Sequence, residues 1–388
     1  MPVNFPLIQT ELQRRADLVD SSTSVNDILQ LLDQINSSTD GKKFEYDSDS
    51  LLPLGDSAYE GMVVLSNGAF KVYNAIYDNW DTLDSSSFPE PTPPPHYQGS
   101  VSGYISGGTP SLGRTDIIEK FPFSTDTNST DVGDLTVERR RVAGQSSSDN
   151  GYTSGGDNAG HLNVIDKFPF SVDANATDVG DLTVSRASAA GQSSDVSGYT
   201  SGASSGGPTN IYLDVIDKFP FAADANATDV GDLTVTRGFG AGQQSTDNGY
   251  TSGGSFFPPS TWYNTIDKFP FAADANATDV GDLTVARSQA AGQSSDVSGY
   301  TSGGSPGSAD IIEKFPFAAD ANATDVGDLN VARYRVAGQS SLSNGYTSGG
   351  QPGPTADIID KFPFAADTNA TYVGDLTSVR YSAAGQQV

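Results

Sequence analysis

Acidic and amide side chains recur in a pattern that could bind a metal ion. One copy, "DANATDVGD", spans residues 173–181 and places oxygen ligands at alternate positions, as Ca²⁺ requires. A standard calcium loop ends in a bidentate glutamate, which is missing, and the last copy has Tyr372 in place of one aspartate. Asp and Asn also cap their own backbone in turns. We therefore interpret the pattern as a capped turn and expect no metal and no cofactor.

Candidate catalytic residues are scarce. Hydrolysis of a glycosidic bond needs two converging carboxylates, and such a pair should break the symmetry of a repeated sequence. Glu138, Asp157 and Asp214 do so, with no evident partner. The two histidines, His96 and His161, are expected to be solvent-facing. We predict no catalytic residues and a protein that is not an enzyme.

Segments that differ between otherwise similar repeats are better candidates for binding, because variable loops on a rigid scaffold commonly carry specificity. The segment 255–264, "SFFPPSTWYN", holds four aromatic residues. Such rings can stack on sugars or anchor a protein contact; alternatively, they cover the rim of the fold. The predicted binding residues in the variable segments are Phe256, Phe257, Trp262, Tyr263, Tyr212 and His161.

Composition limits the partners. The 388 residues carry 21 Lys and Arg against 48 Asp and Glu, a net charge of −27, and contain no cysteine. This charge opposes binding to nucleic-acid phosphates, so no nucleic acid is expected. No apolar run approaches the roughly 20 residues of a membrane helix, and no signal peptide is recognised at the N-terminus. We expect no membrane insertion.

The sequence repeats, and the repeat predicts the fold. Successive "KFPF" motifs lie 46 to 51 residues apart, a period that fits a four-stranded propeller blade. Short β-like runs cut by Gly, Asn, Asp and Ser indicate a mainly β protein. The motifs begin at Lys120, Lys167, Lys218, Lys268, Lys314 and Lys361.

One repeat, read from Arg287, divides into four strands. The predicted inner strand is "SQAAGQSS", whose small residues suit a crowded axis, and the second is "GYTSGG", with an aromatic for the core between blades. The third, "ADIIEKFPF", should end or bend at Pro316 because proline cannot donate to a ladder. The outer strand is expected to be "DVGDLNVAR", residues 325–333, with Arg333 opening the next unit.

The chain ends after an inner strand, residues 381–387, whereas the first repeat begins at its second strand. The two incomplete ends make one whole unit. We therefore predict a six-bladed β-propeller closed by pairing of the N- and C-terminal segments, which removes open sheet edges.

The order "R…AG…GY..GG", "IIDKFPF" and "GDLTVAR" resembles the kelch repeat of galactose-oxidase-like β-propellers over residues 97–388. The tryptophan usual late in a kelch blade is replaced by "GDL". The oxidase activity of that family would need copper-binding histidines and a cysteine cross-linked to tyrosine, so the lack of cysteine excludes it. The near-identity of the copies resembles repeat-bearing structural proteins of phages.

The N-terminal segment predicts a separate α+β module, residues 1–87. Residues 7–19 and 24–36 are expected to form short helices, and 60–83 strands with a turn at Asn67–Gly68. A proline-rich linker, residues 88–96, follows. Residues 60–83 resemble the virion-facing modules of phage fibre proteins.

These features predict a non-enzymatic phage virion protein, a tail, neck or head fibre or appendage. Residues 1–87 would dock to other virion proteins, and the propeller at 97–388 would face a host-surface glycan or protein or a neighbouring subunit. We expect a homo-oligomer on the particle, assembled in the host cytoplasm. The alternative is a secreted or surface kelch-type carbohydrate-binding protein or glycan-active enzyme.

Overall fold

The computed structural model describes residues 98–206, 211–307, 309–352 and 357–388, together with the backbone of four short strands nearer the N-terminus. The chain divides into two compact units, Met1–Pro93 and Pro94–Val388.

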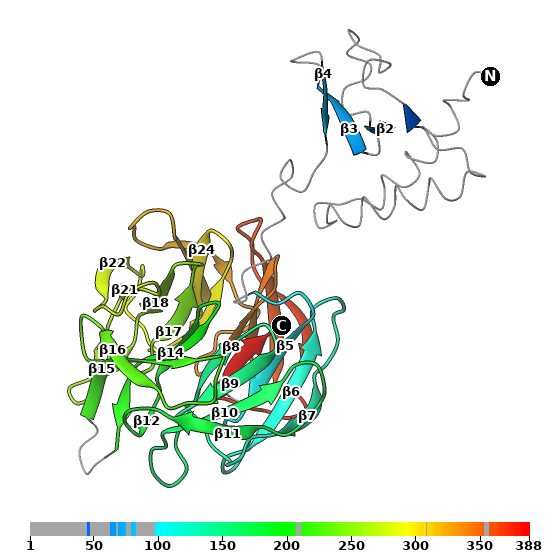
Figure 1. The fold of residues 1–388 in the computed structure, drawn as a ribbon. Helices are drawn as coiled ribbons and strands as arrows, with labels where there is room; N and C mark the ends of the chain where they lie inside the picture. Colours follow the sequence, from blue (N-terminus) through cyan, green and yellow to red (C-terminus); the bar gives the residue numbers. More distant parts are fainter. Residues whose placement is uncertain are drawn as a thin grey trace. The chain divides into compact units, whose positions relative to one another are not determined.

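The second unit is a ring of six antiparallel sheets, each with four main strands (Figure 1). The inner strands are β8 (Ala143–Ser146), β13 (Ala190–Ser193), β17 (Ala241–Gln244), β23 (Ala291–Ser294), β27 (Ala337–Ser340) and β31 (Ala384–Gln387). The second strands are β5 (Ser102–Ser106), β9 (Asn150–Ser154), β14 (Ser197–Ser205), β18 (Asn248–Ser252), β24 (Ser298–Ser302) and β28 (Asn344–Ser348).

The third strands all end at the proline of the repeated motif, as predicted: β6 (Ile117–Pro122), β10 (Val164–Pro169), β15 (Ile211–Pro220), β21 (Thr265–Pro270), β25 (Ile311–Pro316) and β29 (Ile358–Pro363). The outer strands are β7 (Thr130–Asp134), β11 (Thr177–Asp181), β16 (Thr228–Asp232), β22 (Thr278–Asp282), β26 (Thr324–Asp328) and β30 (Thr371–Asp375). Three short strands are added at loops: β12 (Arg186–Ala187), β19 (Ser255–Phe256) and β20 (Thr261–Trp262).

The ring closes by pairing its two ends. The C-terminal β31 is the inner strand of the sheet β31-β5-β6-β7, and it runs antiparallel to β5 with Ala384 opposite Ser106. The prediction of a six-bladed propeller closed by its terminal segments is confirmed, although the closing strand is shorter than residues 381–387.

Glycines set the packing at the axis. Each inner strand contains one, and a Cβ atom added there would lie 2.0–2.2 Å from the carbonyl oxygen of the equivalent glycine in the neighbouring blade. No side chain fits in that space. The axial glycines are Gly144, Gly191, Gly242, Gly292, Gly338 and Gly385.

Glutamines connect the blades just beyond the axial glycines. Each inner-strand glutamine donates from Nε2 to a tyrosine carbonyl oxygen on the second strand of the next blade, at 2.9–3.1 Å. The bonds form a complete circle: Gln145 to Tyr199, Gln192 to Tyr250, Gln243 to Tyr300, Gln293 to Tyr346, Gln339 to Tyr104 and Gln386 to Tyr152.

Aromatic side chains fill the space between blades, as predicted. In one cluster, Tyr300 and Ile312 of one blade pack against Phe362 and Ala370 of the next. The rings of Tyr300 and Phe362 are 5.5 Å apart, and Tyr300 stacks on Phe364 at 4.9 Å. The hydrophobic core is therefore divided among the interfaces between blades.

The predicted outer strand is wrong at its end. Strand β26 stops at Asp328, and the next residues leave the sheet because Leu329 is buried between blades and Arg333 is fully buried. Arg333 pairs at 3.2 Å with Asp360 on the third strand of the following blade. Every blade contains such a pair: Arg139–Asp166, Arg186–Asp217, Arg237–Asp267, Arg287–Glu313, Arg333–Asp360 and Arg380–Glu119.

The Asp/Asn turn caps a neighbouring blade as well as its own. Asp325 accepts a hydrogen bond from Gly327 N at 3.2 Å, which is the predicted local cap. Asn322, however, accepts from Asp282 N of the preceding blade at 3.0 Å, and Asp320 pairs with Lys268 there at 2.5 Å. The turn thus locks the outer edges of adjacent blades together.

The first unit contains the strands β1 (Glu45–Tyr46), β2 (Val63–Ser66), β3 (Ala69–Asn74) and β4 (Asn79–Thr82), in one sheet in that order. Ser66 is opposite Ala69, so two residues separate β2 from β3, in agreement with the predicted hairpin. The predicted helices 7–19 and 24–36, the linker 88–96 and His96 lie outside the described residues. In the described part of the chain, no helix has the length and apolar character needed to span a membrane.

The axial glycines lead to a first prediction. Gly242→Ala places a methyl group 2.1 Å from the position of Gly191 O, and backbone on both sides prevents relief. We expect a loss of about 3 kcal/mol or more in unfolding free energy, measured by urea denaturation. Gly160→Ala is the matched control, because nothing lies within 4 Å of its added Cβ. Equal stability of the two variants would contradict the packing described for the axis.

Candidate binding face and axial hollow

The variable segments lie on one face of the propeller. Each inner strand begins where the second strand ends; Ala143 at the start of β8 is opposite Ser154 at the end of β9. The segments between second and third strands therefore lie at the same end of the ring as the residues that precede the inner strands. We call this end the loop face.

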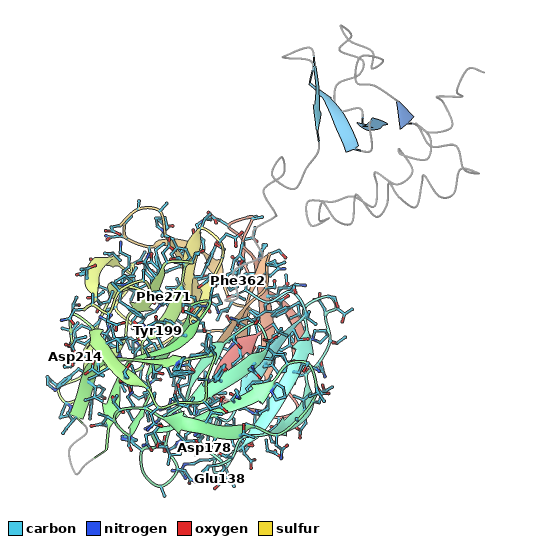
Figure 2. The ribbon with its side chains drawn as sticks, viewed as in Figure 1. Glu138, Asp178, Tyr199, Asp214, Phe271 and Phe362 are labelled. Atoms are coloured by element: carbon cyan, nitrogen blue, oxygen red, sulfur yellow. The ribbon has the colours of Figure 1, made fainter. Side chains whose placement is uncertain are left out.

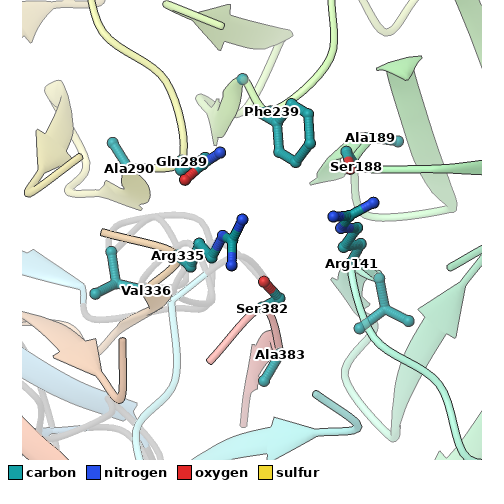
Figure 3. Close-up of a pocket in the computed structure, with 12 residues that line it drawn as sticks. Arg141, Ser188, Ala189, Phe239, Gln289, Ala290, Arg335, Val336, Ser382 and Ala383 are labelled. Carbon is teal, nitrogen blue, oxygen red and sulfur yellow. The ribbon is translucent and has the colours of Figure 1, made fainter. Parts of the chain in front are cut away.

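An open hollow lies at the centre of the loop face, around the propeller axis (Figure 3). The empty space within it is about 410 Å³, a figure that includes space open to solvent. Every blade supplies two consecutive residues: Arg141 and Val142, Ser188 and Ala189, Phe239 and Gly240, Gln289 and Ala290, Arg335 and Val336, and Ser382 and Ala383. No carboxylate is among these lining residues.

The first residue of each pair has a left-handed backbone. Their φ angles are 56° to 63°, although none is glycine, and each N–H donates to the carbonyl of its counterpart in the preceding blade at 2.7–2.8 Å. Six such bonds form a closed circle. We call these residues the axial ring: Arg141, Ser188, Phe239, Gln289, Arg335 and Ser382.

The axial ring combines a uniform backbone with dissimilar side chains. A left-handed conformation costs a non-glycine residue roughly 1–2 kcal/mol, so the surrounding structure must impose it. Strained backbone of this kind is concentrated at functional sites. The repeat thus holds side chains of different charge and size at equivalent points around one hollow.

Two arginines make the hollow basic. The guanidinium groups of Arg141 and Arg335 point into it from different blades (Figure 3). Arg141 lies over the Phe239 ring at 5.7 Å. Burial lowers the pKa of Arg141; the charge of Asp157 opposes this shift, and those of Arg140 and Arg335 add to it.

Arg335 is held by neutral groups. It donates from Nη1 to Gln351 Oε1 at 3.1 Å, and its guanidinium lies 5.6 Å from the rings of both Tyr334 and Tyr381. These contacts orient the guanidinium without neutralising it.

The acidic residues considered for catalysis do not form a pair. Asp157 is a counter-ion for arginines: Arg114 and Arg140 each approach it to 3.2 Å, and Arg141 to 3.8 Å. Glu138 is exposed, Asp214 lies within β15, and Figure 2 shows these two far from each other.

The predicted aromatic residues divide into two groups. Phe256 packs on the buried Tyr212 with ring centroids 5.0 Å apart, which is the rim-covering arrangement. Phe257 and Trp262 are 55% and 40% exposed and are available for contact. Tyr263 is half-buried, and its N–H donates to Gly254 O at 2.9 Å.

His161 is half-buried rather than solvent-facing. Burial lowers its pKa, the charge of Asp157 raises it, and that of Arg141 lowers it. The Nδ1 atom has no hydrogen-bond partner among the described residues.

The repeated Asp/Asn pattern that resembles a calcium loop makes structural contacts between and within blades. In the copy at 173–181, Asp173 pairs with Lys120, Asn175 accepts from Asp134 N, and Asp178 accepts from Gly180 N. Across the described residues, no group of three His, Cys, Asp or Glu side chains is arranged as metal ligands.

Sequence reasoning missed the axial ring. The available signal was the position three residues before each axial glycine, which differs in charge and size although the Ala-Gly-Gln that follows is the same in every copy. The left-handed backbone could not be predicted from the sequence, because Arg, Phe and Gln rarely adopt it, whereas a glycine would have suggested it.

Comparison with known proteins addresses the fold. No protein-family model and no curated protein matches the sequence. Among solved structures, one described as "Structure of YjhT" matches with a TM-score of 0.56 and 12% identity, covering 73% of this chain and 98% of that chain. The chain is a six-bladed β-propeller. At this identity the likeness shows the propeller fold alone.

The strain in the axial ring gives a stability prediction. Replacing Ser188 and Ser382 by glycine removes the steric cost of their left-handed backbone and little buried surface. We expect each change to raise the unfolding free energy by up to about 1 kcal/mol, measured by urea denaturation. Ser343→Gly, at an exposed position outside the ring, is the control and should be neutral or destabilising. A loss of stability in both ring variants would contradict the claim that the left-handed backbone of these residues is strained.

Proposed function

We propose that the protein is a non-enzymatic structural appendage of a phage particle, which presents the loop face of its propeller to a host-surface glycan or protein. The observation that carries this proposal is the direction in which the chain enters the ring. Gln98 donates to Ser294 O at 3.2 Å and Gly99 N to Ser340 O at 2.8 Å. Both acceptors end inner strands, at the face opposite the loop face.

This arrangement suits display. Gln98 and Gly99 lie at the face opposite the variable segments. Exposed Phe257, Trp262 and Leu112 lie in those segments, and the net charge of −27 keeps such a head soluble. The near-identity of the copies, which resembles repeat-bearing phage proteins, supports the assignment to a virion.

Attachment is tested by truncation. A variant lacking residues 1–87 should remain folded, because the propeller closes through β31 and β5 without them. It should be lost from purified particles, as measured by mass spectrometry against the full-length protein. If the truncated protein is found in particles at the normal copy number, residues 1–87 are not the docking module. Secretion of the full-length protein with none on particles would favour the alternative of a surface kelch-type sugar-binding protein.

Recognition is tested at the exposed aromatic loop. Replacing Phe257, Trp262 and Tyr263 by Ser should reduce particle adsorption to host cells about tenfold or more, since exposed aromatic anchors commonly contribute 1–2 kcal/mol each. The melting temperature should fall only modestly, because Phe257 and Trp262 are exposed and Tyr263 alone is half-buried. Leu112→Ser, a 90% exposed residue in another loop, is the control. Normal adsorption with a lowered melting temperature would instead assign the loop to rim packing.

A further inference from the structure

We propose that the axial hollow binds an acidic sugar, with the oxyanion of the ligand held by Arg141 and Arg335. A carboxylated and a sulfated sugar share this chemistry. The site is distinct from the aromatic loop at 255–264. The inference goes beyond the proposed function, and it holds whether or not the protein is carried on a particle.

Charge distribution is the first reason. The chain has 48 acidic residues against 21 basic ones, yet the hollow is lined by two arginines and no carboxylate. The third-strand lysines and the buried arginines that open each blade are all paired with Asp or Glu; Lys268–Asp320 and Arg237–Asp267 are examples. Arg141 has Asp157 at 3.8 Å, whereas Arg335 contacts Gln351 and two aromatic rings instead. A partly buried guanidinium without a counter-ion favours an incoming oxyanion.

Unsatisfied polar atoms are the second reason. The Ser188 hydroxyl, in a residue only 5% exposed, has no hydrogen-bond partner among the described residues. The same holds for Gln289 Oε1 and Arg335 Nε. All three belong to residues that line the hollow. Buried polar groups are normally satisfied, so these atoms leave hydrogen-bonding capacity unused beside the hollow. Because they are covered in this structure, the hydroxyl groups of a ligand would reach them only after their side chains rotate.

The shape and the remaining wall are the third reason. The hollow is open on the loop face and is lined by side chains from all six blades, so a ligand can enter it along the propeller axis. Phe239 stands on one side of the hollow and offers an apolar ring against which the C–H face of a sugar can pack (Figure 3). The closed circle of backbone hydrogen bonds fixes these groups before the ligand arrives, which lowers the entropic cost of binding.

Titration of the full-length protein tests the site directly. Isothermal calorimetry with glucuronic acid and with galactose 6-sulfate should detect binding by at least one of them, and glucose and galactose should bind at least tenfold more weakly. The stronger acidic ligand identifies carboxylate or sulfate as the preferred oxyanion. Failure of both acidic sugars to bind at millimolar concentration would overturn the proposal, as would equal binding of the neutral sugars.

Variants locate the binding. Arg335→Met should weaken binding about tenfold or more, the usual effect of losing a charge-assisted hydrogen bond. Phe239→Gly removes the aromatic ring and should weaken binding. Glycine adopts the left-handed backbone of this position without steric cost, so the change adds no backbone strain that could lower stability. Lys268→Met is the control, because Lys268 pairs with Asp320 at the outer edges of the blades, away from the hollow, and should leave affinity unchanged. Equal effects of the Arg335 and Lys268 variants would refute the assignment.

One further comparison separates this site from the proposed function. The triple change at Phe257, Trp262 and Tyr263 should leave the affinity for the acidic sugar unchanged, even if it abolishes adsorption to cells. If that variant loses sugar binding, the ligand sits on the aromatic loop and the axial assignment is wrong. If a tri-glutamate peptide binds the hollow more tightly than either acidic sugar, the ligand class is wrong.

Discussion

The contact of six glycines around the axis is the constraint on which the propeller depends. Each inner strand passes so close to the next that a Cβ atom would fall 2.0–2.2 Å from a carbonyl oxygen. This distance requires glycine at that position in every blade, and it sets the spacing of the six strands. The glutamine next to each glycine can then reach the tyrosine carbonyl of the following blade. The aromatic residues follow, because the tyrosine that supplies that carbonyl also carries the ring that packs between blades.

Closure makes these contacts mutually dependent. Each blade donates to the next, so the circle of glutamine bonds is complete only when Gln386 of β31 reaches Tyr152. The contacts at the outer edges of the blades also form a complete circle only on closure, when Lys361 pairs with Asp126 and Asp375 N donates to Asn128. The buried pairs add a further constraint: Thr377, which follows the last outer strand, and Arg380 both bind Glu119 near the start of the ring. The two chain ends are thus joined at the axis, in the buried layer and at the rim.

The sequence predicts features that lie within one repeat better than contacts that join two repeats. Three features were predicted correctly because each depends only on position along one copy of the repeat. They are the period of the repeat, the proline that ends the third strand and the C-terminal inner strand that completes the first blade. The contacts of Asn322 and Leu329 run between copies. Since neighbouring copies are nearly identical, one sequence cannot tell a partner within a blade from its equivalent in the next. The axial ring was missed for another reason: its left-handed backbone is imposed by hydrogen bonds from adjacent blades, so Arg, Ser, Phe or Gln can occupy it. The exposed Phe257 and Trp262 could be proposed because they stand in a segment that breaks the repeat.

The route by which the chain enters also determines how the propeller would bear load from its N-terminal side. Gln98 and Gly99 bind Ser294 and Ser340, which belong to two different blades. The chain then continues into β5, which lies between β31 and β6 in its sheet. A force on residue 98 is therefore shared by several blades and by two ladders of hydrogen bonds, because β5 is not an edge strand. It acts at the face opposite the axial hollow, so the circle of backbone bonds that shapes the hollow lies at the far end of the inner strands. The chain therefore joins the ring at the face opposite the surface that varies between blades.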